Sequence, residues 1–416
     1  MMNETSEHRA QPPAPLHNWL ATRRANLRVL RSTSAFQIAT KLWLGWVIIM
    51  ILFQAAVWAR LHVVGPDDAY GWTWEYSSTP PRVGLGLSHV RWDSYHYLRL
   101  AKMGYHGTQD AAFYPAYPVL MRYTALLFFK PVMPDVWAAR DIEVFARAGF
   151  AVSIIASLAA VWSMFILYRD LLGSDDDAFR ATFYSLIFPT AMFMTQVYTE
   201  SLYLALATPA LIFLLRRQWW ACGVLTVLAT LTRATGVLIV GAMALHWLLD
   251  WRAGKRPPWH TLIPMVLPVI TWQIHVAMLA AIGLNMNVAQ KNFGRVMFSP
   301  DNIQIVLNDI GYMITHEMGF VPIMEDIALP ALALWGCWKA RRRWPVLALY
   351  GVASLAVPFA TGQLVSMNRY AVIVVPMYLA LAIKGRNPMF DRLWTTISLL
   401  LLALYMVGFA HGYWSG

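Results

Sequence analysis

Charged residues are scarce in this chain: Asp, Glu, Lys and Arg make up only 13% of its 416 residues. A soluble domain carries about 25% charged residues, so this shortage excludes a soluble domain large enough to fold alone. Cysteine is scarcer still, with only Cys222 and Cys337. Two cysteines exclude a disulfide framework and offer no metal-ligand spacing. We interpret both as small apolar residues of the protein core.

Hydrophobic residues, in contrast, make up 58% of the chain. They form continuous runs from Lys41 onward, and about 20 apolar residues suffice to cross a bilayer. Continuous rather than alternating runs argue against a β-barrel. We therefore expect an all-α polytopic membrane protein with about eleven transmembrane helices. The expected spans are residues 42–61, 143–168, 179–197, 201–215, 219–232, 235–250, 260–283, 320–338, 344–361, 369–383 and 393–411.

The net charge of +11 is best explained by membrane orientation rather than by nucleic-acid binding. If the N-terminus lies in the cytoplasm, nearly every dense basic cluster falls in an inner loop, as the positive-inside rule requires. The C-terminus and the two longest loops, 62–142 and 284–319, then lie outside. The inner-loop basic residues are Arg169, Arg180, Arg216, Arg217, Arg252, Lys255, Arg256, Lys339, Arg341, Arg342, Arg343, Lys384, Arg386 and Arg392.

The first 30 residues lack the apolar core of a secretory signal, which begins here only near Leu42. We expect residues 1–40 to form a basic cytoplasmic tail and residues 41–416 to form a single transmembrane domain. The chain also lacks a detectable internal repeat. The inverted symmetry typical of secondary transporters is therefore not evident.

One polar and aromatic stretch, residues 91–105, follows the first span and should lie on the outer surface. Its Asp93 is a carboxylate near the membrane boundary, which is costly unless the group is solvated or paired, and this makes it a candidate functional residue. Tyr95, Leu98 and Lys102 fall at helical spacing and predict a short amphipathic helix that begins near Asp93. Two structural alternatives remain open: Asp93 is a solvated loop residue, or it only caps that helix.

The unusual polar residues collect on the outer side of this topology, which indicates an outward-facing active site. Outside the cytoplasm a nucleotide sugar is not available, so the site suits a lipid-linked sugar donor. Arginines near the bilayer surface can bind the lipid phosphate, and a nearby carboxylate can deprotonate an acceptor hydroxyl. The outer polar residues are Asp93, Tyr114, Tyr198, Thr199, Glu200, Ser201, Arg233, Lys291, Arg295, His316, Glu317, Asn368, Arg369 and Tyr370.

Five motifs arrive in a fixed order between about residues 90 and 380. They are Trp92-Asp93-Ser94-x-x-Tyr97 through Gly104-Tyr105, Phe113-Tyr114-Pro115-x-Tyr117-Pro118, Tyr198-Thr199-Glu200-Ser201-Leu202, Thr232-Arg233-x-x-Gly236, and Arg369-Tyr370 near Pro376. In this order they resemble the glycosylphosphatidylinositol mannosyltransferase 2 family, which adds the second mannose during anchor assembly and has bacterial homologues.

The resemblance implies a C-superfamily glycosyltransferase fold and an inverting transfer from a polyprenyl-phosphate sugar. It places the essential outer-loop acid at Asp93, as the catalytic base. Arg233, Arg369 and Lys291 are then expected to bind the donor phosphate. No cofactor and no metal are expected; the partners are the lipid-linked donor, a lipid or glycan acceptor and membrane lipids, without nucleic acid. The expected substrate-binding residues are Trp92, His96, Tyr114, Tyr117, Glu200, Tyr370 and His316.

Each assignment has a plainer structural alternative. Arg233 can be a snorkelling side chain and Arg369 the end of a span. Glu200 can cap a helix that begins at Ser201. His96 and His316 can be hydrogen-bonded structural histidines, and the aromatic residues at span ends can be interfacial anchors.

The function expected from the sequence is a mannosyltransferase of the bacterial plasma membrane with its active site on the outer face. The acceptor stays open. The alternative is a transporter or flippase of a polyprenyl-linked sugar, which would also need interfacial arginines. A transporter should show polar residues along a path to the inner side, whereas the inner halves of these spans are apolar. A structural scaffold would not explain why polar residues gather on one side.

Overall fold

The computed structural model describes residues 33–60, 87–129, 139–296, 299–315, 324–362, 364 and 366–410, and the regular elements in these ranges are all helical. In chain order they are α2 (Thr33–Arg60), η1 (Leu87–His89), α4 (Asp93–Met103), η2 (Thr108–Ala112), α5 (Ala116–Thr124), η3 (Ala125–Phe129), α6 (Ala139–Leu172), α7 (Asp175–Leu186), η4 (Pro189–Thr195), α8 (Glu200–Leu215), α9 (Trp219–Thr230), η5 (Ala234–Leu238), α10 (Ile239–Arg252), η6 (Trp259–Leu262), α11 (Ile263–Ala281), α12 (Met286–Asn292), α13 (Asn302–Thr315), η8 (Met324–Ala328), α15 (Leu329–Ala340), α16 (Pro345–Phe359), α17 (Met367–Ala371), α18 (Val375–Lys384) and α19 (Pro388–Ala410).

Several of these helices are long and apolar enough to cross a membrane. In the described part of the chain five qualify, at Ala35–Arg60, Glu143–Leu172, Ala234–Arg252, Trp259–Ala281 and Pro388–Ala410. A sixth span results if η4 and α8, which are bent by 100° at their junction, count as one. Shorter apolar helices, among them α9, α16 and α18, accompany them. The described residues confirm an all-helical architecture with several helices of membrane-spanning length, and the expected number of eleven spans stays a prediction.

Two expected spans are divided by prolines or by the turns before them. The span expected at 179–197 ends as α7 at Leu186 and continues as the 3-10 helix η4, which begins at Pro189. The residue before a proline is disfavoured in the α conformation, so an α-helix ends there readily. The span expected at 369–383 is likewise split into α17 and α18, and Pro376 lies in the first turn of α18.

The two expected outer loops are largely helical where they are described. The first contains α4 and α5; the second contains α12 and α13. The side chain of Asn285 accepts hydrogen bonds from the backbone N–H groups of Asn287 and Val288 and so caps α12. Such capping satisfies backbone donors that would otherwise lack a partner at the start of a helix.

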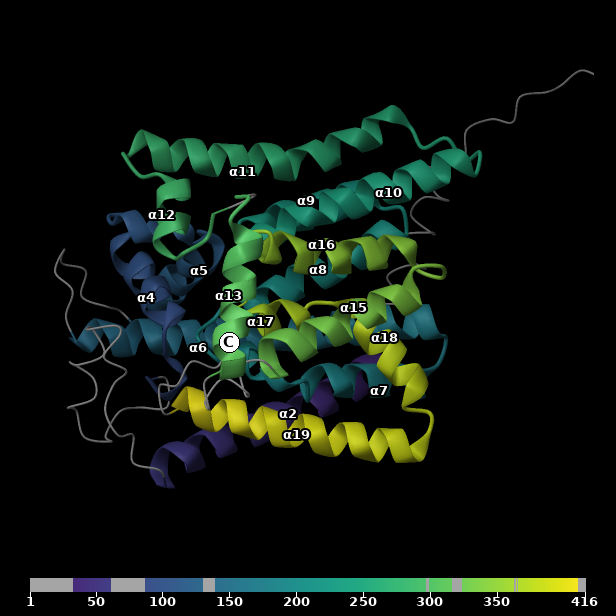
Figure 1. The fold of residues 1–416 in the computed structure, drawn as a ribbon, viewed down its shortest axis with the longest axis horizontal. Helices are drawn as coiled ribbons and strands as arrows, with labels where there is room; N and C mark the ends of the chain where they lie inside the picture. The colour runs from purple at the N-terminus through teal and green to yellow at the C-terminus, as the bar shows by residue number, and fades with distance from the viewer. Residues whose placement is uncertain are drawn as a thin grey trace, which may run out of the picture.

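Most long helices lie roughly side by side, whereas α4, α5 and α12 stand together at one end of the molecule (Figure 1). A large apolar core is shared by α2, α6, α8, α15, α18 and α19. A smaller core lies beneath α4, where Tyr97, Leu98, Tyr117 and Phe145 are buried. This smaller core holds α4 against α5 and α6 and fixes the position of its first residue, Asp93.

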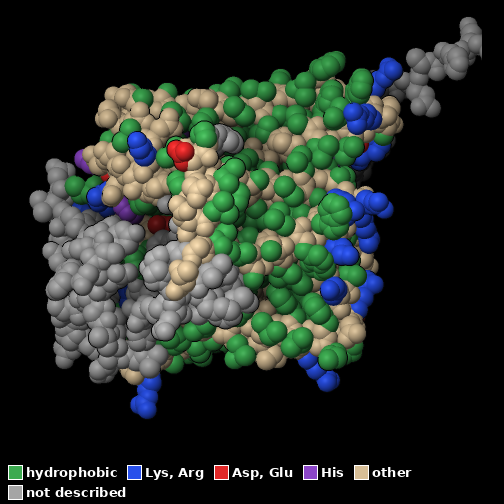
Figure 2. Space-filling view, viewed as in Figure 1, with side chains coloured by type: hydrophobic (Ala, Val, Ile, Leu, Met, Phe, Trp, Pro, Cys, Tyr) green, Lys and Arg blue, Asp and Glu red, His purple; other side chains and the backbone are tan. Residues whose placement is uncertain are grey.

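The basic residues gather at the end of the molecule away from α4 and α12, where Figure 2 shows a row of Lys and Arg side chains. At this end Arg386 pairs with Asp177 and Arg217 pairs with Asp250, each at 2.6 Å. The triple-arginine turn between α15 and α16 is also here. The distribution matches the charge asymmetry on which the predicted membrane orientation depends.

Candidate active site

Asp93 is the first residue of α4, and the chain enters this helix through an unusual turn. Trp92, which precedes it, has a positive φ of 52°, a backbone conformation that non-glycine residues rarely adopt. The N–H of Ser94 bonds to the carbonyl of Arg91 at 3.0 Å and closes the turn. The Asp93 side chain is 25% exposed, and its Oδ2 accepts a hydrogen bond from Nη1 of Arg369 at 3.1 Å. The carboxylate is therefore engaged across the fold by a residue 276 positions away.

A second acid, Glu200, begins α8 directly after the sharp bend at residues 196–199. This bend is fixed to the turn before α4, since Val197 N–H bonds to the carbonyl of His89 at 3.1 Å. The hydroxyl of Tyr198 also donates to the carbonyl of Arg91, at 3.0 Å. Two segments more than 100 residues apart thus bring Asp93 and Glu200 to one place.

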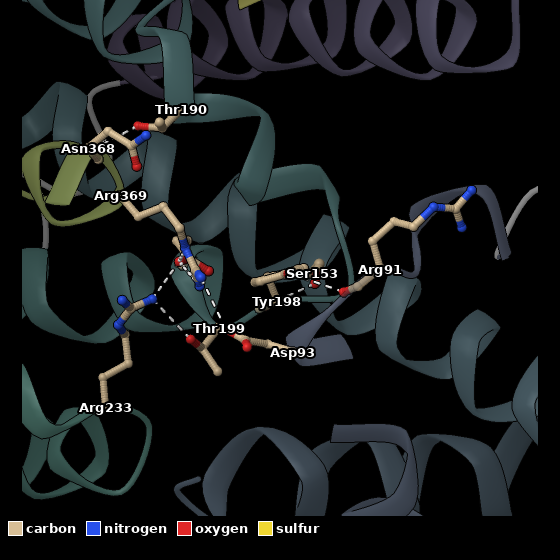
Figure 3. Close-up of polar contacts among 10 residues, drawn as sticks. Arg91, Asp93, Ser153, Thr190, Tyr198, Thr199, Arg233, Asn368 and Arg369 are labelled. Carbon is tan, nitrogen blue, oxygen red and sulfur yellow. Dashed lines mark hydrogen bonds and ion pairs between the residues drawn. The ribbon is translucent and has the colours of Figure 1, made fainter. Parts of the chain in front are cut away.

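Glu200 joins the two arginines expected at the site. Its Oε1 accepts a hydrogen bond from Nη1 of Arg233 at 2.6 Å and from Nη2 and Nε of Arg369 at 2.7 and 3.0 Å (Figure 3). Arg233 also donates to Oγ1 of Thr199 at 3.1 Å. The Glu200 side chain is 1% exposed, so the pairing takes place away from water, where an unpaired charge would be costly.

The guanidinium of Arg369 is enclosed by aromatic rings as well as by acids. Its central carbon lies 4.7 Å from the ring centres of both Phe193 and Tyr198, which is within cation–π distance. Burial opposes its charge, and the carboxylates of Glu200 and Asp93 supply the compensating negative charge. The residue is therefore a permanently charged group in a rigid setting.

The segment that carries Arg369 is itself held by buried polar contacts. Thr190 Oγ1 donates to the carbonyl of Asn368 at 3.1 Å, and Asn368 Nδ2 donates to the hydroxyl of Tyr405 at 3.2 Å. Asp326 accepts a hydrogen bond from the N–H of Asn368 at 3.3 Å, at the start of α17. The residue before this helix, Ser366, has a φ of 72°, which is unfavourable for a non-glycine residue. The buried hydrogen bonds around Asn368 stabilise this turn.

Two residues expected to bind substrate lie next to this ion-pair cluster. The Tyr370 ring stacks under Arg233, with 5.4 Å between the guanidinium carbon and the ring centre. Trp92 is partly buried beside Asp93 and packs against the large core.

The other expected substrate-binding residues have structural contacts where they are described. His96 is 4% exposed and stacks on Phe113 with ring centres 4.4 Å apart, and burial lowers its pKa to about 4. The Tyr114 hydroxyl accepts a hydrogen bond from Trp272 at 3.2 Å. The Tyr117 hydroxyl contacts Ser153 at 2.7 Å inside the smaller core.

Of the remaining two expected residues, one has no described contact with the ion-pair cluster and the other lies outside the described residues. Lys291 is exposed in the last turn of α12, and its side chain forms no ion pair with the residues that the structure describes. His316 falls outside the described residues. In the described ranges no group of three or more His, Cys, Asp or Glu side chains is arranged to hold a metal ion.

Sequence reasoning assigned no role to three residues that hold Arg369 in place. Phe193 and Asp326, which contact Arg369 or its helix, were not singled out, and Tyr198 was named only among the outer polar residues. Tyr198 offered a signal, because it directly precedes the Thr199-Glu200 pair on the outer side. Phe193 and Asp326 fall within expected apolar spans, and nothing in their local sequence indicates a contact with α17.

Comparison with known proteins gives a family match for part of the chain. Residues 84–250 match the family model described as "Mannosyltransferase (PIG-V)". The GPI alpha-1,6-mannosyltransferase 2 of Cricetulus griseus is 32% identical over 157 residues, which cover 38% of this chain and 30% of that protein. The GPI mannosyltransferase 2 of Schizosaccharomyces pombe is 24% identical over 157 residues, covering 37% of this chain and 31% of the relative. The matched segment thus spans less than a third of either relative.

Solved structures with similar helix arrangements include two of an Archaeoglobus fulgidus oligosaccharyltransferase. The complex with Zn and sulfate has a TM-score of 0.44 at 13% identity and covers 89% of this chain and 53% of that one. The complex with an inhibitory peptide and a dolichol-phosphate has a TM-score of 0.41 at 14% identity and covers 90% and 56%. At these scores the structural likeness adds nothing to the family match.

The matched segment contains Asp93, Glu200 and Arg233, three of the four residues of the ion-pair cluster. Its relatives are mannosyltransferases by name, as the five motifs predicted. Over residues 84–250 this chain resembles the glycosylphosphatidylinositol mannosyltransferase 2 family.

Proposed function

We propose that this protein is an inverting mannosyltransferase with a C-superfamily glycosyltransferase fold. It takes mannose from a polyprenyl-phosphate donor and transfers it to a hydroxyl group of a lipid or glycan at the outer face of the plasma membrane. The observation that carries the proposal is the pairing of Asp93 with Arg369, in a cluster that also contains Glu200 and Arg233. A partly exposed carboxylate beside fixed cations provides both a base and a site for an anion.

In the proposed reaction the acceptor oxygen attacks the anomeric carbon of the mannose and forms the new glycosidic bond. The bond between that carbon and the phosphate oxygen breaks, and its electron pair leaves with the polyprenyl phosphate. The proton of the acceptor hydroxyl passes to the carboxylate of Asp93. Attack and departure occur on opposite faces of the sugar, so the anomeric configuration inverts.

The two acids are expected to have different roles because their surroundings differ. Asp93 is 25% exposed and has a single arginine partner on Oδ2 among the described ion pairs, so it can face a substrate. Glu200 is 1% exposed and holds Arg233 and Arg369. We infer that Asp93 is the base and that Glu200 positions the cations. Fixed cations stabilise the developing phosphate charge strongly because they need no reorganisation during the reaction.

The position of the site in the molecule supports an outer location. Asp93 begins α4, and α4 lies at the end of the molecule away from the row of basic side chains (Figures 1 and 2). If that row faces the cytoplasm by the positive-inside rule, then α4 faces outward. A sugar donor that binds at the outer face must be lipid-linked, because nucleotide sugars are not available outside the cytoplasm.

The test uses the purified full-length protein in lipid nanodiscs with polyprenyl-phosphate-[³H]mannose and a lipid extract as the acceptor source. We expect labelled mannose to appear in a new glycosidic product, with no transfer from GDP-mannose as the control donor. One polyprenyl phosphate should be released for each glycosidic bond formed, which would account for the leaving group. Movement of the donor across the bilayer of sealed proteoliposomes, without a new glycosidic bond, would instead indicate the transporter and would overturn the proposal.

A further inference from the structure

The segment that follows α12 connects the two sides of the ion-pair cluster. At one end, the Phe293 ring packs edge-on against His96 of α4, with ring centres 5.7 Å apart. At the other end, Val296 N–H bonds to the carbonyl of Thr361 at 3.2 Å, close before the segment that carries Arg369. Asn302 Nδ2 strengthens this link by donating to the carbonyls of Val296 and Ala360 at 2.6 and 2.7 Å. Residues 293–296 thus extend from the Asp93 helix to the chain before α17.

Arg295 lies in the middle of this bridge and is partly exposed. Its charge acts on the phenol of Tyr370, as do the charges of Arg233 and Arg369. Tyr370 itself stacks on Arg233. Arg295 is therefore a third arginine near the same tyrosine, and it is carried by an outer segment instead of by the core of the cluster.

The charges of the buried cluster already cancel among themselves. The two guanidinium groups of Arg233 and Arg369 contribute two positive charges, and Glu200 and Asp93 contribute two negative charges. An incoming phosphodiester carries one negative charge, and the departing polyprenyl phosphate carries more. Placing that charge against a neutral cluster requires an additional cation, because an uncompensated charge at a partly desolvated site is costly.

We propose that Arg295 supplies this cation and contacts the phosphate of the polyprenyl donor. This inference rests on the proposed function and deepens it by naming the phosphate contact. Arginine suits the role, since its planar guanidinium can donate two parallel hydrogen bonds to phosphate oxygens. Arg233 and Arg369 then lie behind it with their charges balanced by Glu200 and Asp93, and Glu200 holds both arginines in place.

The chain offers a matched control in Arg60. It has the same side chain and is exposed in the last turn of α2, at the expected outer end of the first span. If general attraction of an anionic lipid to this surface were the cause of binding, the two residues would contribute equally. A specific phosphate contact predicts that only Arg295 matters.

The experiment measures binding of undecaprenyl phosphate, which needs no sugar transfer, to the purified full-length protein in detergent by microscale thermophoresis. We expect Arg295→Gln to raise the Kd about tenfold, equivalent to about 1.4 kcal/mol, and Arg295→Lys to restore part of the loss. Arg60→Gln should change the Kd less than about twofold, or about 0.4 kcal/mol. Thermal unfolding of each variant verifies that the fold is retained.

Equal Kd values for wild type and Arg295→Gln would overturn the inference, as would an equal loss in Arg60→Gln. Failure of the wild type to bind undecaprenyl phosphate would overturn it as well. The mannose-transfer assay is separate: an Arg295-dependent lipid-phosphate site in a protein without transfer activity would refute the enzyme proposal and leave the phosphate contact standing.

Discussion

A single oxygen atom, Oε1 of Glu200, accepts hydrogen bonds from both Arg233 and Arg369 at 2.6 and 2.7 Å. The two arginines come from the turn after α9 and from α17, so this oxygen connects distant parts of the chain. With one carboxylate between them, two like charges lie side by side in a buried place. Their arrangement depends on Glu200 more than on any other contact described for the cluster.

We predict that Glu200→Gln destabilises the protein strongly. The amide keeps the shape of the side chain but leaves the buried guanidinium of Arg369 and the partly buried guanidinium of Arg233 without their shared charge partner. Loss of one partner of a buried pair costs about 3–5 kcal/mol. The measurement is the free energy of unfolding in detergent, and the control is Glu143→Gln. Glu143 pairs with Arg147 at 38% exposure, so its loss should cost less than about 1 kcal/mol. Similar losses in both variants would contradict the central role of Glu200.

We predict that Asp93→Asn abolishes most mannosyl transfer while the fold and the expression level remain intact. Loss of a general base lowers kcat by about 10²–10⁴-fold, and the amide still fits beside Arg369. The comparison is with Asp301→Asn, an exposed acid before α13, which should retain full activity. Full activity of Asp93→Asn in the nanodisc assay would remove Asp93 as the base.

The long helices could be predicted from the sequence because their signal is local. The apolar runs indicated α2, α6, α11 and α19 with ends displaced by one to nine residues, since hydropathy reports the burial of a run and not its capping. The break between α7 and η4 was missed because the residues before it and the residues after it, 189–195, are mostly apolar. Hydropathy alone cannot distinguish a straight span from one that bends within the membrane.

The site could be predicted as a set of residues but not as an arrangement. Topology placed Asp93, Glu200, Arg233 and Arg369 at outer span ends, which establishes only a common side of the membrane. Their pairing depends on contacts across 33 to 276 positions, for which a single sequence carries no signal. For the same reason Glu200 was expected to bind substrate, whereas the structure shows it holding two arginines.

We predict that Arg369→Ala and Arg233→Ala weaken the use of the donor more than the use of the acceptor. Both side chains contribute positive charge where the lipid phosphate is proposed to lie, whereas an acceptor hydroxyl is neutral. The measurement is the KM for each substrate at saturation of the other, with a larger rise expected for the donor. An unchanged donor KM in both variants would contradict the assignment.

We predict that Asp326→Ala impairs catalysis through the position of Arg369. The carboxylate accepts the N–H of Asn368 at the start of α17, and it is 7% exposed. Without it the turn at Ser366 loses an acceptor and Arg369 shifts relative to Asp93. Because a misplaced cation affects the bound donor first, the donor KM should rise several-fold while the acceptor KM stays constant, and Asp326→Asn should restore part of the loss. A uniform fall in activity that follows protein stability alone would indicate a purely structural residue.

We predict that His96 makes the stability of the protein depend on pH between about 6.5 and 4. Burial lowers the pKa of His96 to about 4 in the folded state, from an ordinary value of 6.5. Above pH 6.5 the imidazole is neutral in both states and has no effect. As the pH falls below 6.5, the unfolded chain binds a proton that the folded chain cannot bind until about pH 4. The folded state therefore loses stability through this window, by about 2 kcal/mol at pH 5.

The variant that isolates this effect is His96→Phe, which keeps an aromatic ring against Phe113 but cannot titrate. Thermal unfolding at pH 7 and pH 5 should show a smaller loss of Tm in the variant than in the wild type. His89, whose pKa burial also lowers to about 4, is present in both proteins and cancels in the comparison. The same loss of Tm in both proteins would show that His96 is not the titrating group.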